Sequence, residues 1–304
     1  MPIMLVFLGA FMGAVFNFLM RKNIDGGGST RAFLMLELIV AVMAVIILNP
    51  VRAHYYVWSN EIAGVGLIAG LFFGTLMWAQ GKAVQKGPPG LIFAIVNSAA
   101  VFPAVIMAGL FGHDFGYVYT LWHGVGSLLV IGGLFWAGCG ACRAKGFSWI
   151  PFSLIAFFSH ILMLTFIQWR TLHLRPDLPP SELLLSLPVE EAASQWFLPM
   201  VFFGAAAMQI IFYLVKENRA PTHREVRFGF VGGIASACAI FFLTRATEEA
   251  TGVQNAFLFP LSCVTVIVLC NLWGQFLYQE RVNWWATLAC VIGVFVATVN
   301  WAAL

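Results

Sequence analysis

Five of the polar side chains inside the long apolar runs of this chain could each bind a substrate or a proton there. Glu37 is the only acid placed well inside such a run, and His160 lies near the middle of another. The other three are the amides Asn97, Gln209 and Asn271. Polar groups at membrane depth are costly and usually face the interior of a helix bundle, so these residues mark where binding chemistry is expected.

Glu37 allows two interpretations. An ionised carboxylate at membrane depth costs roughly 2.5 kcal/mol or more, so this group should be protonated, paired or hydrated. As a functional group it takes up a proton or binds a cationic part of a substrate. As a structural group it pairs with a basic residue at the cytoplasmic end of the bundle, such as Lys82 or Lys86.

The remaining candidates also have a structural alternative. His160 can titrate near physiological pH, or it can stay neutral and hydrogen-bonded within the bundle. Each amide can bind substrate or bridge two helices. Trp78 and Asn17 end two stripes of glycines spaced four residues apart, which favour close helix packing but leave both side chains as candidates to line a cavity. The predicted substrate-binding residues are therefore Trp78, Asn97, His160, Gln209, Asn271 and Asn17, with Glu37 as the proton or cation coupling residue.

The elements that must position these residues are membrane-spanning helices. The 304-residue chain is 61% hydrophobic and 10% charged, whereas soluble domains carry roughly 25% charged residues. Apolar runs of about the length that crosses a bilayer cover residues 3–20, 32–49, 62–81, 90–112, 117–138, 149–168, 196–215, 228–244, 256–278 and 284–303. The runs are continuous rather than alternating, which favours helices over a barrel. The sequence predicts an all-α polytopic integral membrane protein with ten transmembrane helices.

Positive charges predict the orientation of these helices. Of the 16 Lys and Arg residues, 12 fall in the odd-numbered connections and four in the even-numbered ones. Because cytoplasmic loops retain Lys and Arg, we expect the odd connections in the cytoplasm and both termini extracytoplasmic, in the cytoplasmic (inner) membrane. The net charge of +3 is then the sum of two unlike faces, and no nucleic-acid partner is expected.

Ten spans divide into two halves of five, residues 1–145 and 146–304, and an odd number of spans gives the halves opposite orientations. Lys82-Ala83 and Arg245-Ala246 occupy matching places in the two halves. The long extracytoplasmic connection 170–195 is a linker or a lid over an opening. Pro103 and Pro260 fall inside the fourth and ninth spans, where each is expected to kink its helix.

The second half carries a family pattern. An apolar helix leads through Gly274-Gln275-Phe276-Leu277-Tyr278-Gln279-Glu280-Arg281-Val282-Asn283 into a last helix that contains Val291-Ile292-Gly293-Val294. This pattern resembles the drug/metabolite transporter superfamily, of the EamA type. The first half departs from it, since His113-Asp114 stands where the family has Gly-Glu. The resemblance implies a ten-helix carrier with inverted repeats, alternating access, and a central cavity lined mainly by the first, third, fourth, sixth, eighth and ninth helices.

No enzyme is expected, because the chain contains no H-E-x-x-H, no G-x-S-x-G and no phosphate-binding G-x-x-x-x-G-K-[ST]. Cys139 and Cys142 supply at most half of a zinc site, so neither a metal nor a cofactor is expected. The sequence favours a secondary transporter for a small organic metabolite, in contact with the lipid bilayer and with proton or ion coupling. The alternatives are a multidrug exporter of the same superfamily, a membrane-embedded enzyme, a channel or a structural bundle.

Overall fold

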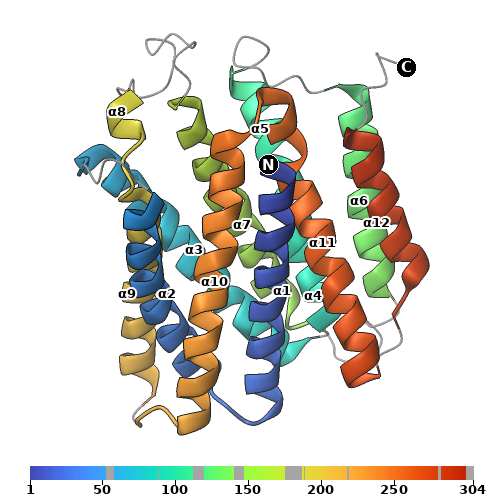
Figure 1. Cartoon of the computed structure of the whole chain (residues 1–304). Helices are drawn as coiled ribbons and strands as arrows, with labels where there is room; N and C mark the ends of the chain where they lie inside the picture. Colours follow the sequence, from blue (N-terminus) through green and yellow to red (C-terminus); the bar gives the residue numbers. More distant parts are fainter. Residues whose placement is uncertain are drawn as a thin grey trace.

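The regular structure consists of helices throughout the described residues. The computed structural model describes residues 1–52, 58–87, 89–111, 120–139, 147–174, 187, 189–217, 219–279 and 282–298, and no strand occurs within these ranges. The helices are α1 (Pro2–Asp25), α2 (Thr30–Arg52), α3 (Asn60–Lys86), α4 (Pro89–Ser98), the short 3-10 helix η1 (Ala99–Val101), α5 (Phe102–Phe111), α6 (Leu121–Cys139), α7 (Ile150–Leu172), α8 (Val189–Ala192), α9 (Phe197–Lys216), α10 (His223–Glu249), α11 (Gly252–Tyr278) and α12 (Trp284–Thr298). Figure 1 shows them as one bundle of mostly upright helices, with α3 running obliquely across it.

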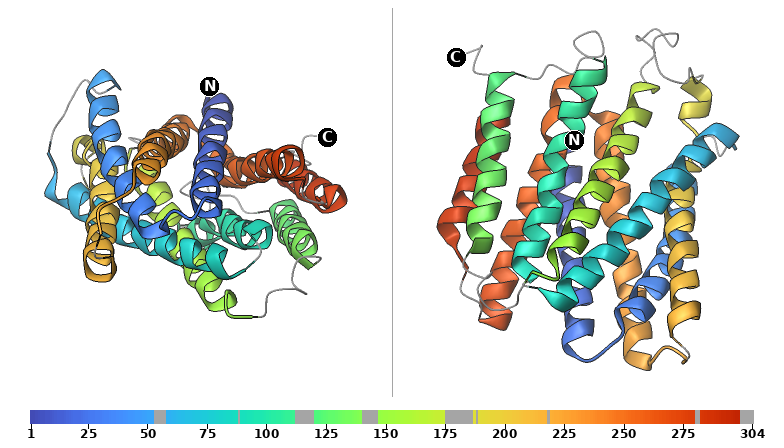
Figure 2. Two further views of the ribbon diagram at one scale, coloured as in Figure 1. Left: turned by 90° about the horizontal axis from the view of Figure 1, so that it is seen from below. Right: turned by 180° about the vertical axis from the view of Figure 1, so that it is seen from behind.

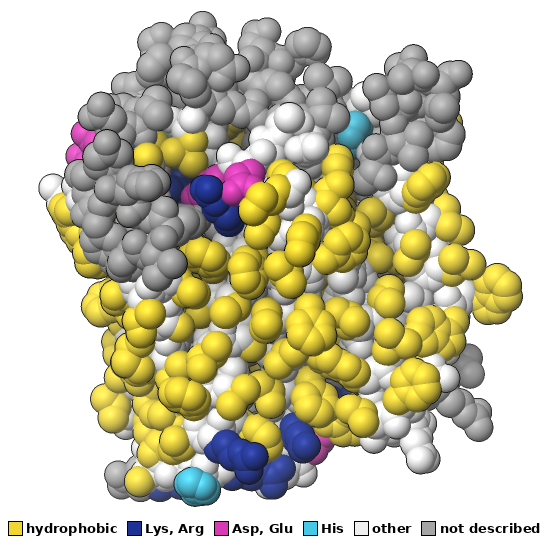
Figure 3. All heavy atoms as spheres, in the orientation of Figure 1, with side chains coloured by type: hydrophobic (Ala, Val, Ile, Leu, Met, Phe, Trp, Pro, Cys, Tyr) yellow, Lys and Arg dark blue, Asp and Glu magenta, His cyan; other side chains and the backbone are white. Residues whose placement is uncertain are grey.

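Each predicted apolar span overlaps a helix of this bundle. Seven helices are long and apolar enough to cross a membrane, and shorter apolar helices cover Ile95–Phe111, Leu121–Gly133 and Trp284–Ala297. Large apolar side chains such as Ile47, Leu128, Leu214 and Phe276 are exposed, and Figure 3 shows hydrophobic side chains over the middle of the bundle surface. A polytopic helical membrane protein is the architecture that these features describe.

The fourth apolar span is divided where a proline falls inside it. The α-helix gives way to the 3-10 helix Ala99–Val101, in which the Phe102 amide donates to the Ala99 carbonyl. Pro103 has no N–H, so it cannot make the helical bond to the same carbonyl four residues back. Pro260 lies inside α11, which continues through it. The two prolines therefore differ in their local effect.

Side chains at the helix starts fix where α10 and α11 begin. The Thr222 hydroxyl accepts from the Glu225 amide while the Glu225 carboxylate accepts from the Thr222 amide. Thr251 and Gln254 make the same reciprocal pair at α11. Each capping box satisfies two N–H groups that would otherwise lack a partner at the helix end. The two longest helices after the middle of the chain thus start at positions encoded by their own sequences.

The main helix contacts can be grouped in pairs, one contact made by a helix of the first half of the chain and a similar one by a helix of the second half. α1 packs against α10 and α11, and α7 packs against α3 and α4. α2 packs against α10, and α9 packs against α3. α4 contacts α6, and α11 contacts α12. Two further contacts, α2 with α9 and α6 with α12, lie at opposite edges of the bundle in Figure 2.

Glycines let several of these helices approach closely. A Cβ added to Gly70 of α3 would lie 2.3 Å from the Val201 carbonyl oxygen of α9. A Cβ added to Gly233 of α10 would lie 2.4 Å from the Glu37 carbonyl oxygen of α2, and one on Gly126 of α6 would lie 2.4 Å from the Gly293 oxygen of α12. Gly66 and Gly74 also face α9. The stripe on α3 therefore packs as its spacing predicts.

One end of the bundle is basic. The α1–α2 and α9–α10 connections lie at the lower end in Figure 1, where Figure 3 shows the larger group of Lys and Arg side chains. The Arg224 guanidinium donates to the Lys22 carbonyl at 2.9 Å and so joins these two connections. Two of the odd-numbered connections therefore lie at the same end of the bundle, where basic side chains of the described residues gather.

Candidate functional site

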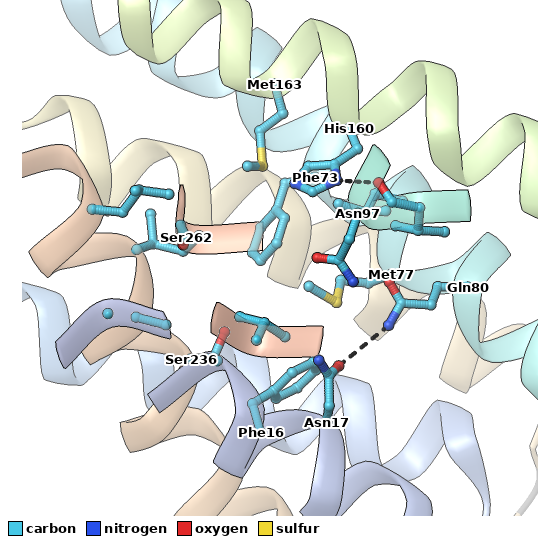
Figure 4. A pocket seen from close by; sticks show the side chains of 18 residues that line it. Phe16, Asn17, Phe73, Met77, Gln80, Asn97, His160, Met163, Ser236 and Ser262 are labelled. Atoms are coloured by element: carbon cyan, nitrogen blue, oxygen red, sulfur yellow. Dashed lines mark hydrogen bonds between the residues drawn. The ribbon is translucent and has the colours of Figure 1, made fainter. Parts of the chain in front are cut away.

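A cavity of about 130 Å³ lies in the middle of the bundle. α1, α3, α4, α7, α10 and α11 line it, and Figure 4 shows their side chains converging on it. Its apolar walls include Phe16, Phe73, Met77 and Met163. Its polar side chains are Asn17, Gln80, Asn97, His160, Ser236 and Ser262. An apolar cavity with a few convergent polar groups is typical of a small-molecule site.

Hydrogen bonds orient three of these polar side chains. His160 Nδ1 lies 2.8 Å from the Val96 carbonyl oxygen. Because a carbonyl only accepts, Nδ1 carries the proton in this contact, and Nε2 of a neutral ring is left as an acceptor. Asn97 donates to the Phe93 carbonyl at 2.7 Å, and Gln80 donates to the Asn17 side chain at 3.5 Å. The cavity thus offers both donors and acceptors to a ligand.

A second pocket of about 70 Å³ extends the site. It shares Asn97, His160 and Ser262 with the first cavity and reaches Phe259 and Cys263 of α11. Asn97 and His160 stand between the two spaces. A ligand that filled both would contact these two side chains.

The site carries no fixed charge among its described lining residues. None of the side chains that line either pocket is Asp, Glu, Lys or Arg, and the histidine at position 160 is the titratable group other than a thiol. Removing an unpaired charge from water into such surroundings is strongly unfavourable. The cavity therefore suits a ligand that is uncharged where it is bound.

α3 and α10 line the cavity with the same spacing. α3 contributes Phe73, Leu76, Met77 and Gln80, and α10 contributes Ser236, Ala239, Ile240 and Leu243. Each set has the i, i+3, i+4, i+7 pattern of one helix face. Lys82 and Arg245 follow the last member of each set by two residues. The register that matches those two basic residues in the sequence also matches the lining positions.

The predicted binding residues divide into two groups. Asn17, Asn97 and His160 come together in the cavity. Trp78 instead packs against Phe152 of α7 and Phe212 of α9, with ring centroids 5.8 and 5.9 Å apart.

Gln209 and Asn271 belong with Trp78 in contacts between helices. Gln209 donates to the Gly74 carbonyl of α3 at 2.8 Å. Asn271 donates to the Thr287 hydroxyl of α12 at 2.9 Å. Neither amide is among the residues that line the cavity. In this structure they bridge helices, which was the alternative interpretation of each.

Glu37 lies behind the cavity wall, fully buried between α2 and α10. Neither of its carboxylate oxygens has a hydrogen-bond partner within the described residues. The alternative pairing with Lys82 or Lys86 is not formed; the Lys86 ammonium lies 4.7 Å from the Phe152 ring centroid instead. Ser236, which lines the cavity, is the polar side chain that faces the carboxyl group, although no hydrogen bond is completed.

Three cavity residues were not anticipated from the sequence. Gln80 lies near the end of its apolar run, where a polar side chain needs no special explanation, and Ser236 and Ser262 are small enough to pass for packing residues. The spacing along the helix could have indicated Gln80, because it follows Phe73 by seven residues and so lies on the same face of α3.

Two networks of ion pairs connect helices near the two ends of the bundle. Glu248 of α10 accepts from Arg170 of α7 at 2.7 Å and from Arg245 at 3.2 Å. At the basic end, Glu225 accepts from Arg219 at 2.6 and 2.9 Å and from the Ser29 amide at 2.6 Å. The hydrogen bonds to Glu225 raise the pKa of the Arg219 guanidinium above its ordinary value, so this cation stays charged.

Several sequence-based expectations concern residues outside the described ranges. Cys139 ends α6, but Cys142, the boundary between residues 145 and 146, and most of the 170–195 connection are not described. The same holds for His113-Asp114 and Glu280-Arg281 of the family pattern. Within that connection, the short helix α8 begins at Val189, directly after Pro188 in the sequence.

Comparison with known proteins establishes the fold alone. No protein-family model matches the chain, and no curated protein matches its sequence. Chains of solved structures do match. One, described only as "Crystal structure of protein", superposes with a TM-score of 0.67 at 15% identity, over 99% of this chain and 96% of that one. The bundle as a whole is therefore an arrangement that another protein also adopts.

Proposed function

We propose that this protein is a secondary transporter that moves a small organic metabolite across a membrane by alternating access. The observation that carries this proposal is the largely apolar cavity, with a few convergent polar side chains, in the middle of a bundle of membrane-spanning helices. Transporters hold their substrate near the bilayer midplane, at the interface of two repeats. His160 and Ser236 lie near the middle of α7 and α10, which agrees with such a site.

The packing supports two inverted five-helix repeats, residues 1–145 and 146–304. Under a shift of five spans, α1 corresponds to α7, α2 to α9, α3 to α10, α4–α5 to α11, and α6 to α12. The main contacts then map onto one another: α1–α10 onto α7–α3, α2–α10 onto α9–α3, and α4–α6 onto α11–α12. The contacts α2–α9 and α6–α12 map onto themselves, as expected across a two-fold axis.

The choice of lining helices supports an EamA-type carrier. α1, α3, α4, α7, α10 and α11 are the first, third, fourth, sixth, eighth and ninth spans of the chain. These are the six helices that the family resemblance implies for a central cavity. They also form three of the corresponding pairs, so each repeat contributes the same three elements.

Charge and size favour an uncharged metabolite as the substrate. A carried carboxylate or phosphate would meet no cation among the described lining residues. The volume of about 130 Å³ lies below the roughly 300–1,000 Å³ of pockets that hold drug-sized ligands. A multidrug exporter remains the second candidate, because Phe16, Phe73, Met77 and Met163 could hold an aromatic cation.

We place the protein in the cytoplasmic (inner) membrane with both termini extracytoplasmic. The support is the gathering of Lys and Arg at one end of the bundle, where the α1–α2 and α9–α10 connections lie. Cytoplasmic loops retain such residues during insertion. Labelling of a single cysteine introduced at Lys22, in intact cells and in opened ones, tests the orientation.

Thermal unfolding of the detergent-purified protein against a panel of amino acids, sugars, nucleosides, sulfonium and ammonium metabolites, and dye-like cations tests the proposal. A ligand that binds the folded state raises the unfolding temperature by mass action. One group of related uncharged stabilisers, carried into liposomes, is the expected result. Asn97→Leu should abolish the shift, whereas Asn271→Leu, which removes an amide outside the cavity, should retain it.

Other outcomes argue against parts of the proposal. Stabilisation by anions would contradict the charge argument. Weak shifts from many hydrophobic cations would favour the exporter. Stabilisers that are never carried into liposomes would overturn transport in favour of an enzyme or a structural protein.

A further inference from the structure

Glu37 lies against the glycine face of α10. A Cβ added to Gly232 would lie 3.7 Å from Glu37 Cγ, and one added to Gly233 would lie 2.4 Å from the Glu37 carbonyl oxygen. Gly229 faces the Glu37 amide nitrogen in the same way, at 3.4 Å. The acid is therefore enclosed by close contact between two helices and does not project toward lipid.

No charge compensates this acid. Among the described residues of the helices packed against α2, the titratable side chains are Arg21, Lys22 and Asp25 of α1; Glu61, Lys82 and Lys86 of α3; Tyr213 and Lys216 of α9; and His223, Arg224, Glu225, Arg227, Cys238, Arg245, Glu248 and Glu249 of α10. All but Cys238 lie near a helix end. None of them pairs with Glu37.

Ser236 connects the acid with the cavity. It is buried on α10, one turn after Gly232, and its side chain faces Glu37. It is also one of the polar residues that line the central cavity (Figure 4). A hydroxyl both donates and accepts, so it can pass a proton between water in the cavity and a carboxylate behind it.

We propose that Glu37 is the proton-binding site of this carrier and that Ser236 connects it with the substrate cavity. The inference rests on the proposed transport function and names its coupling ion. On loading, while the cavity is open to bulk water, a hydrated proton from that water gives its proton to the Ser236 oxygen while the Ser236 hydroxyl gives its own to Glu37. Serine is unchanged, the carboxylate becomes a neutral acid, and one water remains in the cavity. Unloading is the reverse.

The glycine contact explains how the proton state can affect the helices. In the observed arrangement both carboxylate oxygens lack partners, which suits the neutral acid and not the anion. Loss of the proton therefore favours movement of α2 relative to α10. The small residues at 229, 232 and 233 let the two backbones slide without side chains that interlock. Movement between these helices would reshape the cavity, because α10 forms part of its wall.

Infrared spectroscopy of the purified protein between acidic and alkaline pH tests the proton site without any substrate. A protonated carboxyl stretch that disappears as the pH rises, and that is absent from Glu37→Gln, is the expected result. Ser236→Ala should shift the pH at which the band disappears. Ser262→Ala is the matched control, since Ser262 lines the same cavity on α11 and should leave that pH unchanged.

Two results would overturn the inference: a carboxyl band that persists in Glu37→Gln, or equal behaviour of the two serine variants. Should Glu37→Gln not fold, dicyclohexylcarbodiimide labelling of the wild type provides the same readout. Adduct on Glu37, detected by mass spectrometry, should fall as the pH rises, and its absence at every pH would overturn the inference.

Transport assays distinguish a failure of the proton-site inference from a failure of the proposed transport function. A titrating Glu37 in a protein that carries no panel compound would overturn transport and keep the proton site. Flux that is the same with and without a pH gradient, in wild type and in Glu37→Gln, would keep transport and overturn the coupling.

Discussion

Replacement of Gly70 by alanine tests the closeness of the α3–α9 contact. The added Cβ would lie 2.3 Å from the Val201 carbonyl oxygen, 3.0 Å from the Val201 carbonyl carbon and 3.1 Å from the Met200 oxygen. All three are backbone atoms, so no side-chain rotation can relieve the contact. The shortest distance is about 1 Å below the 3.4 Å at which ordinary van der Waals contact begins.

The two helices must therefore separate. Overpacking of a tight interior lowers the free energy of unfolding by roughly 1–3 kcal/mol. The upper half of that range applies here, because the added methyl group meets backbone atoms that cannot rotate away. Alanine is about 1 kcal/mol more favourable than glycine within a helix, which offsets part of the cost. We expect Gly70→Ala to lower the free energy of unfolding by about 1–2 kcal/mol.

Gly64→Ala is the matched control. Gly64 is on the same helix, and a Cβ there would meet no atom within 4 Å, so only the gain in helix propensity, up to about 1 kcal/mol, should appear. Equilibrium unfolding in mixed detergent and dodecyl sulfate measures both variants. A Gly70→Ala protein as stable as the Gly64→Ala protein would refute the proposed contact.

Four further variants test other parts of the structure. Arg170→Met removes one partner of a nearly dry ion pair, in which the side chains are 3% and 7% exposed; a loss of about 3 kcal/mol is expected in equilibrium unfolding, and Arg170→Met with Glu248→Leu should be less unstable than the single change. Asn271→Val should cost about 0.6–1 kcal/mol through its lost interhelical bond, without changing the affinity of any ligand found by thermal shift; an altered affinity would place Asn271 in the site. Arg219→Lys should lower the unfolding temperature although charge is kept, because lysine cannot reproduce the two-pronged contact with Glu225; an unchanged temperature would show that this contact contributes nothing.

The helices could be located from the sequence because run length and continuous hydrophobicity are properties of the chain alone. What those properties leave undetermined is the rotation of each helix. A span that is apolar on every side gives no preferred inward face, so Asn97 and Asn271 looked alike. In the structure one lines the cavity and the other bonds to α12. The break at Ala99–Val101, by contrast, is local and follows from Pro103.

Comparison of the two halves would have supplied the missing rotation. Lys82 and Arg245 match in the sequence, and the same register aligns Phe73, Met77 and Gln80 with Ser236, Ile240 and Leu243 on the cavity faces of α3 and α10. It also aligns Gly66 and Gly70 with Gly229 and Gly233 on their packing faces. Ser236 is not distinctive in the sequence by itself, but its alignment with Phe73 predicts that it faces the cavity.

The same correspondence separates packing from function at Glu37. The glycine face of α3 receives α9, and the glycine face of α10 receives α2, so the two contacts are built alike. In the first, the polar side chain is Gln209, a neutral amide whose N–H is bonded to the Gly74 carbonyl. In the second it is an acid with neither oxygen bonded. Close packing alone does not require an acid, since the corresponding contact is made without one. An unfavourable residue at a site that packing does not explain is expected where function demands it, and this difference between two similar contacts is the strongest reason to assign Glu37 to coupling.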